Sequence, residues 1–272
     1  MDGNPLGQAT EYPSHYDPGL LYGIPRWASR SLLDIDKKLE LHGFDLWRAY
    51  ELSWLNEAGK PEAAMGEFYF DARSENLVES KSLKLYLNSL NNEVFARTEN
   101  FAERIASDLK EVTSSEVKVV IRQLAESSAA QIRVPPGKCI DNLAIRVTEL
   151  QPDAELLRTT GAVTEQCALY SNLFRSNCPV TGQPDWATVM VQYSGPRIEE
   201  SSLLAYLCSF RQHAGYHEEC AERIYRDLMF KCAPESLTVG MNFNRRGGLD
   251  INPFRSNRPI SPERRNYRFV RQ

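Results

Sequence analysis

Residues 79–90, Glu-Ser-Lys-Ser-Leu-Lys-Leu-Tyr-Leu-Asn-Ser-Leu, return 120 positions later as residues 199–210, Glu-Glu-Ser-Ser-Leu-Leu-Ala-Tyr-Leu-Cys-Ser-Phe. Six of the twelve positions are identical, which is well above accident. Residues 102–109 and 221–228 share six further identities, and residues 59–62 resemble 182–185. The chain is therefore interpreted as two divergent copies of one unit. The order of helices and strands within one copy then predicts the fold.

Each copy has the same order of predicted elements: a hairpin, two helices with apolar residues at helical spacing, and a strand, with one more strand expected. The predicted strands are 44–55, 66–70 and 117–121, then 166–177, 187–193 and 237–243; the predicted helices are 82–90, 101–109, 201–210 and 220–229. This order predicts an α+β fold in which antiparallel sheets each carry a helix pair. Successive prolines near Val134–Gly137 place the boundary between units 1–135 and 136–272.

The composition is that of a globular protein, with 42% hydrophobic residues, 25% charged residues and a net charge of −4 over 272 residues. No apolar run approaches the ~20 residues that a bilayer span requires, and Met1–Pro25 lacks the pattern of a secretory signal. We therefore expect a cytoplasmic protein with reduced thiols and no membrane partner. From Arg245 onward eight arginines face two acids, a local charge of +6 that leaves −10 on the remainder. That basic tail is either solvated or binds anions, and no direct nucleic-acid partner is expected.

Polar residues that differ between the copies are the candidates for chemistry, because the scaffold has to be kept in both. Cys178 lies in a polar, turn-rich stretch and is followed by Asp185, where the first copy has Glu62. A nucleophilic thiol needs a nearby cation, donor or base, and Asp185 could be that base or a proton donor. An inert loop cysteine and a turn aspartate remain the structural alternatives. The pair His217-Glu218 likewise occurs only in the second copy, and Lys81 only in the first.

A second cluster, His213, His217 and Cys220, has a spacing that could suit zinc if Cys178 joined it. The segment lacks the second histidine of H-E-x-x-H, and Gly215 is expected to interrupt the helix, so zinc is the less favoured interpretation. The other cysteines, Cys139, Cys167, Cys208 and Cys232, are expected in the core.

No Rossmann or P-loop glycine motif is present in the sequence. Arg245-Arg246-Gly247-Gly248 could instead hold a phosphate through guanidinium forks and close backbone approach. A basic turn without a ligand is the commoner explanation for such a motif.

Taken together, four motifs resemble the long form of the NADPH-dependent 7-cyano-7-deazaguanine reductase family, the nitrile reductases of queuosine biosynthesis. They are Glu79–Tyr86, Asn177-Cys178-Pro179 with Asp185, His217-Glu218, and Arg245–Pro253. The resemblance covers nearly the whole chain in order. It implies a bimodular tunnelling fold, related to GTP cyclohydrolase, whose antiparallel sheets assemble into a barrel, and it suggests a homodimer.

The resemblance also implies roles for individual residues. Cys178 matches the nucleophile that forms a covalent thioimide with the nitrile, and Asp185 matches the acid that protonates the nitrogen. The residues that match substrate binders are Val78, Glu79, Ser80, Tyr216, His217 and Glu218; those that match NADPH contacts are Ser80, Lys81, Arg246 and Gly247. Two NADPH per turnover reduce the deazapurine nitrile to 7-aminomethyl-7-deazaguanine, and no metal is implied. Because Lys81 and Cys178 lie in different copies, the site should be composite.

Three other functions remain open from the residues alone. A cysteine-dependent nitrile hydrolase would use water in place of hydride, and a zinc-dependent cyclohydrolase-like enzyme would use the His213 cluster. A non-catalytic binding module would bind its ligand without Cys178.

Overall fold

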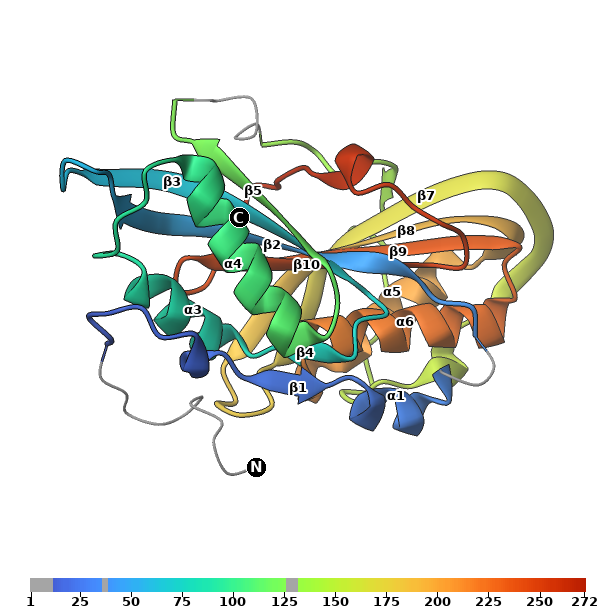
Figure 1. Cartoon of the computed structure of the whole chain (residues 1–272). Coiled ribbons are helices and arrows are strands. Elements are labelled where there is room, and N and C mark those ends of the chain that lie inside the picture. The colour runs from blue at the N-terminus through green and yellow to red at the C-terminus, as the bar shows by residue number, and fades with distance from the viewer. Residues whose placement is uncertain (1–11, 36–38, 126–131) are drawn as a thin grey trace.

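Two long hairpins frame the molecule, and a helix pair follows each of them in the predicted order (Figure 1). The computed structural model describes residues 12–35, 39–125 and 132–272, so residues 1–11 of the N-terminal stretch considered above lie outside the described residues. The strands are β1 (Gly23–Pro25), β2 (His42–Leu55), β3 (Pro61–Asp71), β4 (Asn76–Val78), β5 (Val117–Gln123), β6 (Lys138–Cys139), β7 (Thr159–Asn177), β8 (Pro184–Ile198), β9 (Ser236–Phe243) and β10 (Leu249–Ser256). The helices are α1 (Trp27–Leu33), α3 (Ser80–Ser89), α4 (Thr98–Thr113), α5 (Glu200–Cys208) and α6 (His217–Cys232).

Strands from both copies join in one sheet of order β5-β3-β2-β10-β9-β8-β7-β6, whereas the repeat predicted a sheet for each unit. The junction is β10, the additional strand of the second copy, which pairs antiparallel with β2 over its whole length. All other neighbours are antiparallel except β6 and β7. The α+β class is therefore as predicted. Among the described strands the sheet is open, with β5 and β6 at its edges, so the expected barrel is not closed within the chain.

The helices pack against one face of this sheet, because alternate strand residues point to opposite sides. Trp47 and Ala49 of β2 pack in a core with α3 and α4, while Val239 and Met241 of β9 pack in a second core with α5 and α6. A smaller cluster on the opposite face contains Phe44, Leu46, Met190, Phe254 and Phe269. Figure 1 shows the C-terminal segment running across the strands, and Tyr267 and Phe269 of this segment pack in the smaller cluster.

Residues that are identical in the two copies have the same structural role. The Tyr86 hydroxyl of α3 donates to Asp108 of α4 at 2.6 Å, and the Tyr206 hydroxyl of α5 donates to Asp227 of α6 at 2.6 Å. Each bond ties the two helices of a pair through buried tyrosine rings. The repeat in the sequence is thus a repeat of the scaffold.

The cysteines differ in part from the prediction. Cys208 and Cys232 are buried, as predicted, and Cys167 is only half-buried. Cys139 is exposed, so its prediction as a core residue was wrong. It lies in the two-residue strand β6 at the edge of the sheet, where no neighbouring strand covers it. Within the described part of the chain, no helix combines the length and apolar character needed to traverse a bilayer.

Candidate active site

One pocket brings together most of the residues that the sequence singled out, and it is built from both copies. Ile24, Trp47, Leu77, Val78, Glu79 and Ser80 line it from β1, β2, β4 and α3; Cys178, Pro179, Asp185, Gly215, Tyr216, His217, Glu218, Arg246 and Ile251 line it from the second copy. Two candidates for cofactor binding, Lys81 and Gly247, are not among the lining residues. The composite site was expected from Lys81 and Cys178; the first copy contributes Glu79 and Ser80 of the same motif to the pocket, and not Lys81.

Glu79 is the N-cap of α3 and is only 1% exposed. Its carboxylate accepts the backbone N–H groups of Lys81 at 2.8 Å and Ser82 at 2.7 Å. An anion suits this position because the first N–H groups of a helix have no intrahelical partner. The Ser80 hydroxyl, 3.4 Å from the Glu79 carboxylate, lines the same wall. This geometry fixes a negative group against the pocket before any ligand binds.

Cys178 lies in the tight loop that connects β7 to β8. Its backbone N–H donates to the Gln183 carbonyl at 2.8 Å, and its own carbonyl accepts the N–H of Gly182 at 3.0 Å. Gly182 has a φ of +68°, a conformation that favours glycine. Burial acts to raise the pKa of the thiol, yet hydrogen bonds from the Thr181 hydroxyl and from the backbone of Thr181 and Val180 lower it below its ordinary value. The loop thus stabilises the thiolate form of a side chain that is 6% exposed.

Asp185 is the second residue of β8 and is 6% exposed. Arg246 donates to one of its carboxylate oxygens, and His217 Nε2 lies 3.7 Å from the other. The His217 ring packs edge-on against Phe243, with 4.0 Å between ring centroids. A carboxylate, a guanidinium and an imidazole therefore meet beside the thiol, and each can exchange or orient a proton.

The first turn of α6 supplies the opposite wall. Tyr216 is its N-cap residue and Gly215 precedes it, so the helix begins at His217, three residues before the predicted start at 220. Glu218 is 3% exposed, and its Oε1 has no hydrogen-bond partner among the described residues. Burial and the nearby charge of Asp45 raise the pKa of this carboxyl above its ordinary value. A buried acceptor without a partner is suited to donors of a ligand.

The Arg245–Gly248 turn borders this pocket and lies against Lys84 of α3, a cation that the sequence analysis missed. Gly247 and Gly248 have φ values of +57° and +76°, and a Cβ at Gly247 would come within 2.9 Å of Lys84 Nζ. Burial and the neighbouring Arg246 lower the pKa of Lys84. Lys84 lies one turn after Ser80 on α3, and the two line a small adjoining pocket with Arg246. The i, i+4 spacing from Ser80 is the signal that could have identified it.

Two family models match the chain: "Nitrile reductase, 7-cyano-7-deazaguanine-reductase N-term" over residues 12–121 and "QueF-like protein" over residues 184–261. A protein of Dechloromonas aromatica named NADPH-dependent 7-cyano-7-deazaguanine reductase is 49% identical over 254 residues, covering 93% of this chain and 90% of that protein. A protein of Desulfotalea psychrophila with the same name is 48% identical over 256 residues, covering 93% and 92%. The chain belongs to this reductase family.

These matches confirm the family that the four motifs indicated. Both relatives are named as NADPH-dependent reductases. The solved structure of the archaeosine synthase QueF-Like in the apo form is 18% identical, with a TM-score of 0.34, and covers 36% of this chain and 98% of that chain. A similarity at this level has no bearing on the fold.

Among the described residues, the candidate zinc ligands of this 7-cyano-7-deazaguanine reductase family member do not point to a common site. Cys220 of α6 is fully buried in the core, and His213 Nε2 lies 3.8 Å from Glu219 Oε1. His217 instead points to Asp185. No group of three His, Cys, Asp or Glu side chains that could hold a metal occurs among these described residues.

Proposed function

We propose that this chain catalyses the NADPH-dependent reduction of the nitrile of 7-cyano-7-deazaguanine to 7-aminomethyl-7-deazaguanine, a step of queuosine biosynthesis. The single observation that carries the proposal is the pocket itself, in which the Cys178 thiol, the Asp185 carboxylate and the Glu218 acceptor face one space. The names of the relatives at 49% and 48% identity support it.

Cys178 is proposed as the nucleophile. A nitrile is a poor hydride acceptor, and addition of the thiolate to its carbon converts it to an imine-like carbon. The sulfur–carbon bond forms as one π bond of the nitrile becomes a lone pair on nitrogen. Protonation of that nitrogen gives a covalent thioimide. The lowered pKa of Cys178 supports this role, because it raises the fraction of thiolate at neutral pH.

Asp185 is proposed as the group that delivers the proton to the nitrile nitrogen. His217 Nε2, 3.7 Å away, is positioned to replace the proton after transfer. Arg246, which pairs with the same carboxylate, orients it toward the pocket. A positioned proton donor of this kind contributes typically about 10²–10⁴-fold to a rate.

The remaining polar residues are proposed to bind the deazapurine. Glu218 has an oxygen with no partner in the described part of the chain, which could accept the N–H groups of the purine-like edge, and Tyr216 offers an aromatic face. His217, Val78, Glu79 and Ser80 complete the contacts. Glu79 carries the second carboxylate, already oriented by the α3 N-terminus.

The donor set beside the pocket fits a phosphate-bearing cofactor. Arg246 and Lys84 supply cations, and the left-handed Gly247-Gly248 turn lets an anion approach the backbone closely. With Ser80 and Lys81, these residues are proposed to hold NADPH, which supplies one hydride at a time and two per nitrile. The overall balance is R–C≡N + 2 NADPH + 2 H⁺ → R–CH₂–NH₂ + 2 NADP⁺.

The organisation of the whole enzyme is part of the proposal. Residues 1–135 and 136–272 form the two units, and the open edges at β5 and β6 offer pairing positions through which a homodimer would close a barrel. A cytoplasmic location fits a substrate that is a free base. The net charge of −10 on residues 1–244 favours neither RNA nor DNA as a direct partner.

Intact mass spectrometry with the nitrile base tests the function. The wild-type chain should gain the mass of the base, and added NADPH should clear the adduct and release the amine. Cys178→Ala should neither gain mass nor consume NADPH, whereas Cys139→Ala, which removes an exposed thiol, should behave as wild type.

Two outcomes would overturn the proposal. Full activity of Cys178→Ala would exclude the covalent route. Adduct loss without NADPH oxidation would identify a nitrile hydrolase instead.

A further inference from the structure

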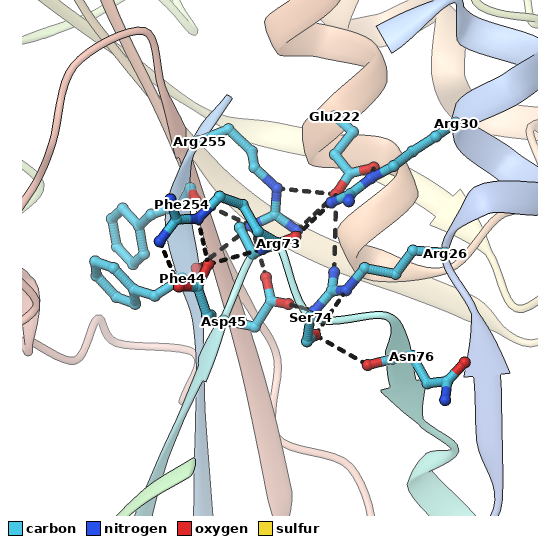
Figure 2. A network of polar contacts seen from close by, with 12 residues as sticks. Arg26, Arg30, Phe44, Asp45, Arg73, Ser74, Asn76, Glu222, Phe254 and Arg255 are labelled. Carbon is cyan, nitrogen blue, oxygen red and sulfur yellow. Dashed lines mark hydrogen bonds and ion pairs between the residues drawn. The ribbon is translucent and has the colours of Figure 1, made fainter. Parts of the chain in front are cut away.

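Figure 2 shows a buried network of five charged side chains, Arg26, Arg30, Asp45, Glu222 and Arg255. Glu222 of α6 accepts two bonds from Arg30, at 3.0 and 2.7 Å, and one from Arg255 Nε at 3.0 Å. Asp45 of β2 accepts from Arg255 at 2.7 Å and from Arg26 at 2.5 Å. All five are between 0% and 7% exposed, with Arg255 fully buried. Burying so many charges is costly unless the geometry is well satisfied, so the network needs a reason beyond stability.

Four of these residues are close in sequence to a residue that lines the pocket. Arg26 follows Ile24 by two residues, and Asp45 precedes Trp47 by two on β2. Glu222 follows Glu218 by one helical turn on α6, and Arg255 follows Ile251 by four on β10. The network therefore joins β2, α6, β10 and the residue that follows β1, and each of these segments also contributes to a wall of the site. It links the copies as well, because the Arg30–Glu222 and Arg255–Asp45 pairs each join one copy to the other.

The repeat supplies an internal comparison. Glu103 of α4 occupies the position in the first copy that Glu222 occupies in the second, and Glu99 corresponds to Glu218. Glu103 and Glu99 are both exposed, whereas Glu222 and Glu218 are buried. The same residue type at the same helical position is thus engaged in an ion network only next to the pocket. Maintenance of the shared scaffold does not explain that difference.

We infer that Glu222 is a positioning residue, which through Arg30 and Arg255 seats the first turn of α6 against the walls contributed by β1 and β2. It has no place in the lining of the pocket and acts through Glu218 and His217, one turn away on the same helix. The inference deepens the proposed function and rests on it. Its consequence is that the charge of Glu222 governs how well the nitrile base binds, and has little effect on the chemical step.

The test compares Glu222→Gln with Glu103→Gln. The amide keeps the shape of the side chain and removes its charge, which leaves Asp45 as the single acid of the network beside three guanidiniums. We expect Glu222→Gln to raise KM for the nitrile base at least tenfold with kcat within threefold of wild type and KM for NADPH unchanged. Glu103→Gln should leave all three unchanged. A KM for the base within twofold of wild type in folded Glu222→Gln would overturn the inference.

Two further measurements separate positioning from general loss of stability. The double variant Glu222→Gln with Arg30→Gln removes one charge of each sign, so its melting temperature should return toward wild type while KM for the base remains high. Recovery of KM together with the melting temperature would overturn the inference.

Hydrogen exchange in the free protein is independent of the reaction. Backbone amides of residues 217–221 should exchange at least tenfold faster in Glu222→Gln than in Glu103→Gln. Equal exchange rates in the two variants would contradict the positioning role of Glu222, even if the enzyme reduces the nitrile. Failure of the wild type to oxidise NADPH with the nitrile base would instead contradict the proposed function alone.

Discussion

His217 Nε2 lies 3.7 Å from Asp185 Oδ2 on the wall of the pocket, while Arg246 holds the other oxygen of the same carboxylate. Asp185 therefore has a cation on one side and a proton carrier on the other. The guanidinium cannot give up its proton at neutral pH, so a proton that reaches Asp185 from this pair comes from the imidazole. In the proposed mechanism, the carboxylate would relay a proton between His217 and the space beside Cys178.

Asp185→Asn should therefore lower kcat for nitrile reduction by about 10²–10⁴-fold, because an amide cannot pass a proton. The adduct with Cys178 should also form poorly, since the nitrogen anion is not neutralised. Steady-state NADPH oxidation and intact mass spectrometry measure the two effects. Glu62→Gln changes the corresponding acid of the first copy, which lies outside the pocket, and should keep wild-type rates. A similar loss in both variants would contradict the relay.

Thr181→Val should make Cys178 less reactive, since the Thr181 hydroxyl is one of the donors that lower the pKa of the thiol. The variant keeps the size of the side chain and removes one hydrogen bond. We expect the pH midpoint of alkylation at Cys178 to rise by about 0.5 to 1 unit, the equivalent of one hydrogen bond.

Peptide-resolved mass spectrometry of iodoacetamide labelling gives this midpoint, and the exposed Cys139 serves as a reference thiol in the same sample. An unchanged midpoint at Cys178 would show that the backbone donors of the loop suffice.

The sequence predicted the elements well because their signals are local and occur twice. The helices at 82–90 and 201–210 are found as α3 and α5, and both predicted hairpins are present. The pairing of β10 with β2 could not be predicted, since the apolar pattern of a strand shows which face is buried and not which strand lies beside it. Because strand pairing could not be predicted, two sheets were expected where the structure has one eight-stranded sheet.

The sequence predicted those pocket residues that belong to distinctive motifs. Cys178, Asp185 and the His217-Glu218 pair line it together, as the differences between the copies suggested. Lys84 was missed because a lysine in a helix is ordinarily a solvated residue, and only the fold places it against the Gly247 turn. The buried arginines were missed for the same reason, since arginine is almost never fully buried unless paired.

His213 should make the stability of the protein depend on pH below neutrality. Burial, and then the charge of Arg223, lowers the pKa of its imidazole from 6.5 to about 4. The neutral ring is favoured in the folded state, so the unfolded chain binds more protons between these values. The contribution is fully present above pH 6.5 and is lost as the pH falls toward 4. Allowing for partial screening by solvent, we expect it to amount to about 2 kcal/mol.

Urea unfolding of wild type and His213→Gln at pH 7 and pH 4 isolates this contribution. The free energy of unfolding should fall by about 2 kcal/mol more in wild type than in the variant over that interval. His42→Gln, which changes a histidine beside the exposed Glu40, should follow wild type. Parallel behaviour of wild type and His213→Gln would assign the pH dependence to other groups.

The duplicated tyrosine–aspartate bonds should differ in strength although their lengths are equal. Asp227 Oδ2 accepts only the Tyr206 hydroxyl among the described donors, whereas Asp108 Oδ2 accepts Tyr86 and also Tyr16, at 2.9 Å. Tyr206→Phe therefore leaves a buried carboxylate oxygen unpaired, and we expect it to lower the free energy of unfolding by about 2–3 kcal/mol. Tyr86→Phe leaves Asp108 with its second donor and should cost about 1 kcal/mol. Urea denaturation at pH 7 measures both, and the double variant Tyr16→Phe with Tyr86→Phe should approach the cost of Tyr206→Phe. Equal losses in the two single variants would mean that Tyr16 does not compensate.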